Sequence, residues 1–167
     1  MVHHIHIAVL DVDIPARKLY EARGLSSAHF RTILRETASR LNETLFSEKE
    51  QVEVQVTPYD IRGGHYPDLY KLRGHAGENQ IPVHSPVDAV LITGGSPGVY
   101  EMDHSPWMQE LEKFVKTVYN QYPEVRLLGT CFGHQLISHA LVRNVEDPVR
   151  DVWVEQCPLG REVGIYT

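Results

Sequence analysis

Two short runs of this sequence, residues 5–10 and 89–92, are apolar at almost every position. A strand that is apolar on both sides must be covered on both faces of its sheet, which is the usual state of strands in parallel sheets. Residues 52–57, which alternate apolar and polar side chains up to Pro58, and residues 125–128 complete a set of four expected strands. The sequence therefore predicts a parallel sheet with helices on both sides.

Helical patterns separate these strands. From residue 27 to residue 45 one apolar stripe follows the i, i+3, i+4 spacing of a helix; its members are Phe30, Ile33, Leu34, Ala38, Leu41 and Leu45. Ser105 and Pro106 are typical of a helix start, as N-cap and first helical residue. A further stripe covers 136–141, whereas 61–88 are rich in glycine and proline and are expected to form a long loop with one helical turn near Leu69. The alternation predicts a three-layer α/β fold.

The composition narrows the class of protein. The chain has 167 residues, enough for one domain spanning 1–167, with 42% hydrophobic and 23% charged residues, as in ordinary globular proteins. A formal net charge of −6 without a basic stripe argues against nucleic acid as a partner. The sequence has neither a membrane-spanning apolar run nor a signal-peptide pattern at its start, and its two cysteines are too few for a disulfide framework. We therefore expect a cytoplasmic protein that makes no contact with a membrane.

One cysteine lies where the fourth expected strand turns into a helix. Cys131 has Gly129 two places before it and Gly133 two places after it. This spacing is typical of a nucleophile elbow, a tight strand-to-helix turn in which a side chain at either glycine position would crowd the reversal. A thiol there faces the positive end of the following helix, which favours the thiolate. The alternative is that Cys131 is a small buried hydrophobe.

A second glycine-bearing turn follows the third expected strand. In Gly94-Gly95-Ser96-Pro97-Gly98 the bare backbone allows N–H groups to approach a ligand closely, although a glycine pair also suits a sharp strand end. The N–H groups of Gly95 and Phe132 are candidate donors of an oxyanion hole. The loop lacks the Lys-Ser/Thr pair of a phosphate-binding P-loop. Both turns follow strands, so in a parallel sheet both should lie at its ligand-binding edge.

The two turns together resemble a known family. The segment from Gly129 to Gln135 is similar to the nucleophile motif of class I glutamine amidotransferases, and 93–100 with 105–107 looks like the oxyanion loop of stand-alone members related to the amidotransferase domain of GMP synthase. The resemblance extends from residue 5 to about residue 166. It implies a flavodoxin-like fold in which Cys131 attacks the side-chain amide of glutamine, ammonia leaves, and water hydrolyses a glutamyl thioester. It further implies that Gly94 and Gln135 bind the substrate and that the reaction needs no cofactor or metal.

The chain departs from this family in one respect. The family activates its cysteine with a His-x-Glu pair downstream, and none of the ten histidines here is followed by glutamate two places on. We expect the chain to be an N-terminal portion, truncated before that pair, with the C-terminal part of the domain missing and with weak or no glutaminase turnover of its own. Neither a synthetase partner nor self-association can be derived from the sequence.

Two other functions are compatible with the sequence, and a third is disfavoured. A γ-glutamyl peptidase would attack the same kind of carbonyl, so the elbow does not distinguish it from a glutaminase. A non-catalytic remnant that binds a partner would explain the missing His-x-Glu pair. A flavin or nucleotide binder would need glycines after the first strand, where 11–15 have none.

Several polar residues have simpler interpretations than catalysis. His4 and His6 are expected at a solvated strand end, and His134 and His139 as helix residues that do not act as the base. Asp11, just past the first strand, could line the site, but acids at strand ends are commonly caps. Residues 149–166 are expected to form a short hairpin, with Cys157 as a structural thiol.

Overall fold

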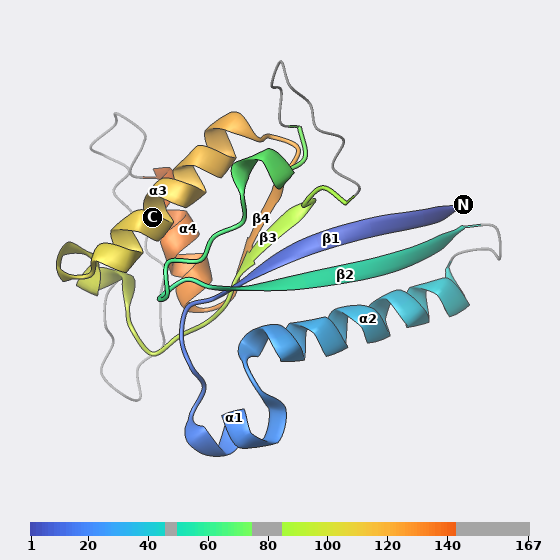
Figure 1. Ribbon diagram of the computed structural model, residues 1–167, viewed down its shortest axis with the longest axis horizontal. Helices are drawn as coiled ribbons and strands as arrows, with labels where there is room; N and C mark the ends of the chain where they lie inside the picture. Colours follow the sequence, from blue (N-terminus) through green and yellow to red (C-terminus); the bar gives the residue numbers. More distant parts are fainter. Residues whose placement is uncertain (46–49, 75–84, 143–167) are drawn as a thin grey trace.

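The computed structural model describes residues 1–45, 50–74 and 85–142. Four parallel strands form one sheet in the order β2-β1-β3-β4 (Figure 1). They are β1 (Val2–Asp11), β2 (Gln51–Asp60), β3 (Ala89–Ile92) and β4 (Arg126–Gly129). This is the order of the first four strands of a flavodoxin-like sheet, in which the strand order reverses between β1 and β3. The predicted parallel α/β sheet is confirmed.

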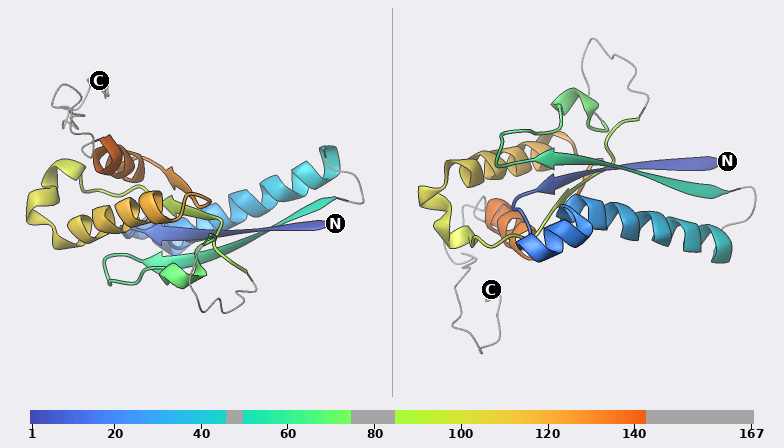
Figure 2. Two further views of the ribbon diagram at one scale, coloured as in Figure 1. Left: turned by 90° about the horizontal axis from the view of Figure 1, so that it is seen from above. Right: turned by 60° about the horizontal axis from the view of Figure 1, so that its bottom comes forward.

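Helices cover both faces of the sheet (Figure 2). On one side lie α1 (Arg17–Arg23) and α2 (Ser26–Thr44), and on the other α3 (Pro106–Gln121) and α4 (Phe132–Val142). Two short 3₁₀ helices, η1 (Leu69–Lys71) and η2 (Val99–His104), complete the described elements. The three layers and the short turn at η1 agree with the sequence. The α1 helix was not predictable from an apolar stripe, because all of its residues are exposed.

The side chains of β1 divide the interior into two cores. Ala8 and Leu10 pack with residues of α3 and α4, whereas Ile7 and Val9 pack with Phe30 and other residues on the α2 side. This alternation is the period of two expected for a strand. Because β1 is buried on both faces, residues 5–10 are apolar at nearly every position.

The α2 stripe is narrower than its sequence suggests. Phe30, Leu34 and Ala38 contribute to or lie against the buried face, but Ile33 is 56% exposed and Leu45, one residue beyond the end of the helix, is 75% exposed. In α3 the helix starts at Pro106 as predicted. Ser105 is the N-cap residue, also as predicted, and its carbonyl accepts the N–H groups of Met108 and Gln109, although its side chain makes no capping hydrogen bond.

The predicted end of the second strand at Pro58 is also wrong. In the structure β1 and β2 pair without interruption from Val2 opposite Gln51 to Asp11 opposite Asp60, and Pro58 lies opposite Val9. Proline is tolerated there because β2 lies at the edge of the described sheet, where a missing N–H breaks no ladder on the open side.

His6 is buried rather than solvated, which corrects the expectation for the start of β1. It is 7% exposed, with Nδ1 2.9 Å from the Ser85 carbonyl oxygen and Nε2 2.8 Å from the Thr57 hydroxyl. Both ring nitrogens therefore have partners within the protein, which accounts for a histidine inside the apolar run. His4 is exposed, as expected.

The expected hairpin at 149–166 and the thiol of Cys157 lie outside the described residues. None of the helices within the described ranges combines the length and apolar character that a membrane crossing requires.

Candidate active site

The turn after β4 holds Cys131 in an unusual backbone conformation. β4 ends at Gly129 and α4 begins at Phe132, so only two residues reverse the chain. Cys131 has a φ of 50°, the only positive value among the described residues other than glycine. Such left-handed geometry is uncommon outside glycine, costs of order 1–3 kcal/mol and persists only where the surrounding structure enforces it. The Cys131 side chain is exposed at the apex of this turn.

The two flanking glycines are sterically required. A Cβ atom on Gly129 would lie 2.4 Å from the carbonyl carbon of Gly133, and one on Gly133 would lie 2.3 Å from the carbonyl oxygen of Ile92 in β3. Both obstacles are backbone atoms, which cannot rotate away as a flexible side chain can. The structure thus confirms that side chains at these positions would crowd the reversal.

The second glycine turn lies against the first. A Cβ on Gly94 would be 3.3 Å from Cβ of Cys131, so the two turns are in van der Waals range. Within the described ranges, the N–H groups of Gly94, Gly95 and Phe132 have no hydrogen-bond acceptor in the protein. Cys131, Gly94 and Phe132 are therefore brought together as the sequence predicts. Gln135 lies one turn into α4, where its N–H donates to the Cys131 carbonyl at 3.1 Å.

Gly95 lies beside the loop that follows β1. A Cβ added there would be 3.1 Å from Cβ of Asp13 and 3.1 Å from a methyl carbon of Val12. Thr93, two residues before Gly95, is tied to the same strand end: its N–H donates to the Leu10 carbonyl at 3.1 Å and its hydroxyl accepts the Val12 N–H at 3.1 Å. The loops after β1 and β3 thus meet at the reversal point of the sheet.

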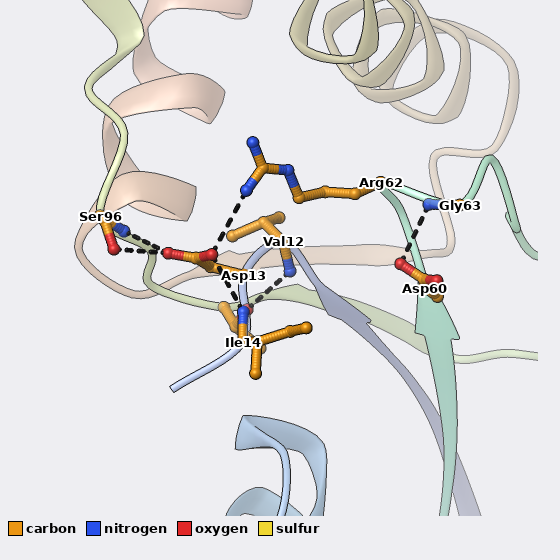
Figure 3. Close-up of polar contacts among 8 residues, drawn as sticks. Val12, Asp13, Ile14, Asp60, Arg62, Gly63 and Ser96 are labelled. Atoms are coloured by element: carbon orange, nitrogen blue, oxygen red, sulfur yellow. Dashed lines mark hydrogen bonds and ion pairs between the residues drawn. The ribbon is translucent and has the colours of Figure 1, made fainter. Parts of the chain in front are cut away.

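The Asp13 carboxylate connects these loops (Figure 3). One oxygen accepts the Ser96 N–H at 2.8 Å and the Ser96 hydroxyl at 2.6 Å. The other accepts the Ile14 N–H at 3.0 Å and lies 3.4 Å from Nη1 of Arg62, which follows β2. Partial burial raises the pKa of Asp13, but the hydrogen bonds from Ser96 and Ile14 and the charge of Arg62 outweigh it and lower the pKa overall.

Arg62 continues the cluster toward the elbow. Its guanidinium carbon lies 5.1 Å from the centre of a Trp107 ring, a cation–π distance, and Trp107 lies 5.6 Å from the Phe132 ring. An open cleft of about 360 Å³ lies among these side chains; it is lined by Asp13, Arg62, Ser96, Pro97, Glu101, Ser105, Trp107 and Met108. A polar cleft therefore adjoins the residue that follows Cys131.

The sequence did not reveal this cluster. Trp107 was expected as part of the stretch 105–107 that resembles the family's oxyanion loop, and no individual role was assigned to Asp13, Arg62 or Ser96. A signal was present, because Asp13 and Arg62 each lie two residues beyond a strand end. The carboxyl ends of parallel strands share one edge, so charged residues just beyond them converge.

Asp11, by contrast, serves the fold. Its Oδ1 accepts the N–H of Ser27 in the first turn of α2 at 2.9 Å, as expected of a helix cap. Burial raises the pKa of Asp11, against the lowering effect of its hydrogen bonds with Ser27.

Among the histidines that the structure describes, none is hydrogen-bonded to the Cys131 thiol. His134 is exposed on the first turn of α4. His139 forms a His–Glu pair with Glu112 of α3, with Nδ1 3.3 Å from Oε1. At 1.5 Å per residue, however, His139 lies about 12 Å along the helix from Cys131, beyond the reach of direct proton transfer. Within the described part of the chain, no three His, Cys, Asp or Glu side chains cluster as a metal site would require.

Comparison with known proteins gives one informative match. No protein-family model matches the sequence, and no solved structure gives a significant match. The chain is 27% identical over 135 residues to a protein of Schizosaccharomyces pombe named as glutamine amidotransferase-like. The aligned region covers 81% of this chain and 47% of that protein, so the chain spans about half the length of its curated relative. This similarity supports the glutamine amidotransferase-like family that the two glycine-bearing turns indicate.

Proposed function

We propose that this chain carries the cysteine nucleophile of a glutamine amidotransferase-like site, with glutamine as substrate. The observation that carries the proposal is the backbone of Cys131: a left-handed φ of 50° between two glycines that admit no side chain. Strained backbone conformations of this kind cluster at active sites and ligand-binding sites, which supports a functional role for Cys131. The similarity to the S. pombe protein supplies the substrate class.

The proposed reaction is acyl transfer to sulfur. The Cys131 thiolate attacks the carbonyl carbon of the glutamine side chain, and the carbonyl oxygen becomes an oxyanion that accepts hydrogen bonds from the N–H groups of Gly95 and Phe132. Collapse of this intermediate breaks the C–N bond and, with a proton, releases ammonia. Water then cleaves the thioester to give glutamate and restore the thiol. Gly94 and Gln135, each of which lies close to Cys131, contact the substrate.

A single-step probe tests the nucleophile without requiring turnover. An L-configured chloromethyl ketone with the glutamine skeleton should alkylate Cys131: a bond forms between sulfur and the chloromethyl carbon, and chloride leaves. The D-enantiomer is the matched control, because its intrinsic reactivity is identical. We expect the L form to react at least about tenfold faster, since only it orients its carbonyl on the site.

Mass spectrometry of peptides separates labelling at Cys131 from labelling at Cys157. A Cys131→Ala variant should lose the enantiomer-selective reaction while any background labelling persists. Equal rates for the two enantiomers, or selectivity that survives Cys131→Ala, would refute the proposal.

A further inference from the structure

The glycine pair in front of Ser96 needs an external restraint. Gly94 and Gly95 have the widest backbone freedom of any residues, so nothing in their own chemistry fixes where their N–H groups point. The segment before them is held by Thr93, whose N–H and hydroxyl are bound to the end of β1. For the pair to have one conformation, the segment after it must be held as well.

Asp13 supplies that second attachment. A single carboxylate oxygen takes both donors of Ser96, the N–H at 2.8 Å and the hydroxyl at 2.6 Å. Because the Ser96 N–H belongs to the peptide plane shared with Gly95, this pair of bonds fixes the orientation of that plane as well as its position. The same carboxylate is oriented by the Ile14 N–H and Arg62 (Figure 3).

We propose that Asp13 is a positioning residue for the proposed reaction: by holding Ser96, it orients the N–H group of Gly95 toward the oxygen of the carbonyl group whose carbon Cys131 attacks. Asp13 itself touches no reacting atom. This inference rests on the proposed function, because an oriented amide matters only if Cys131 attacks a carbonyl.

Two alkylating agents separate positioning from general damage to the site. Displacement of chloride from the L-chloromethyl ketone by Cys131 is fastest when the amides hold the ketone oxygen and so place the chloromethyl carbon beside sulfur. Iodoacetamide lacks the amino-acid part that would seat it in the site, so its displacement of iodide depends mainly on the thiolate and its accessibility. A merely structural defect that exposes, buries or unfolds Cys131 would change both rates together.

The variants form a graded series. Asp13→Ala removes the acceptor for both Ser96 donors, and Ser96→Ala removes only the hydroxyl bond. Asp60→Ala is the matched control, because Asp60 is also a carboxylate at a strand end that accepts a loop N–H, from Gly63 at 3.0 Å, but from a different loop.

We expect Asp13→Ala to lower the ketone rate about tenfold or more and to leave the iodoacetamide rate within twofold, since small misplacement of oxyanion donors is costly. Ser96→Ala should have the same selective effect at about threefold, and it provides the test if Asp13→Ala does not fold. Asp60→Ala should change neither rate.

Suppose that the wild-type protein reacts faster with the L-ketone than with the D-ketone, and that Asp13→Ala reacts with the L-ketone as fast as wild type. That result would overturn the inference and leave the proposed function intact. Equal losses in both rates would overturn it as well, by showing a general structural role. Absence of the L-ketone preference in the wild-type protein would refute the proposed function, and this inference with it.

Discussion

The two glycine-bearing turns at the carboxyl edge of the sheet are fixed in different ways. The elbow around Cys131 is fixed from within: Gly129 and Gly133 pack on each other and on the backbone of β3, with no room for a side chain. The loop at 94–98 is fixed from outside, by a carboxylate 83 residues away in the sequence. The shape of one turn therefore depends on glycines within it that leave no room for a side chain, and the shape of the other depends on a side chain distant in sequence.

This difference determines how each turn should respond to mutation. In the elbow, an added atom meets backbone and must displace a strand. In the loop, loss of a hydrogen bond frees a flexible segment while the strands remain in place. Substitutions in the elbow should thus affect global stability, and substitutions around Asp13 should affect local geometry more than stability.

The largest expected effect is that of Gly133→Ala. Its Cβ would lie 2.3 Å from the Ile92 carbonyl oxygen, so β3 or α4 must shift. We expect a loss of about 3 kcal/mol in the free energy of unfolding, measured by chemical denaturation. Gly64→Ala is the control, because Gly64 has a φ of 78° and nothing within 4 Å of the added Cβ. Gly64→Ala should lower the free energy of unfolding by only about 1 kcal/mol, because of backbone strain at a positive φ. Equal losses would show that the elbow is not crowded.

The next effect is that of Asp13→Ala, and it depends on pH. Because the pKa of Asp13 is lowered below the value of 3.8 that it has when unfolded, the ionised carboxylate stabilises the folded chain. That stabilisation is fully present above the unfolded value and is lost as the pH falls through the lowered folded value. We expect Asp13→Ala to cost about 1–2 kcal/mol at pH 7, and the difference from wild type to shrink below about pH 4. A difference that grows on acidification would contradict this assignment.

A smaller effect of opposite sign is expected at the apex of the elbow. Replacing Cys131 by glycine relieves the left-handed strain, and replacing it by alanine removes the thiol but keeps the strain. After allowing for the greater chain entropy of glycine, Cys131→Gly should be more stable than Cys131→Ala by about 0.5–1 kcal/mol. Thermal denaturation of the two variants side by side measures this difference; an alanine variant as stable as the glycine variant would show that the φ of 50° costs nothing.

The smallest effect is expected at Arg62. Its side chain is half exposed and 3.4 Å from Asp13, a geometry in which ion pairs contribute little. Arg62→Met should change the free energy of unfolding by less than about 0.5 kcal/mol. A double-mutant cycle with Asp13→Ala would reveal a larger role if the coupling exceeds about 1 kcal/mol.

The sequence predicted the fold and the elbow well because both depend on local patterns. Apolar runs predicted β1 and β3, and the Gly-x-Cys-x-Gly spacing predicted the turn at Cys131. The strand end at Pro58 was mispredicted because a strand can continue through a proline when it lies at the edge of a sheet, and the position of β2 at the edge is a property of the whole sheet. His6 was mispredicted because its partners, Ser85 and Thr57, are distant in sequence. The Asp13–Ser96 contact was missed for the same reason.

The central claim is that Cys131 attacks a carbonyl whose oxygen is held by main-chain amides, and a crystal structure of the L-chloromethyl ketone adduct tests it most directly. The account predicts sulfur bonded to the methylene carbon and the ketone oxygen about 2.7–3.1 Å from the amide nitrogens of Gly95 and Phe132. An adduct at Cys131 whose ketone oxygen points to solvent, away from both amides, would contradict it.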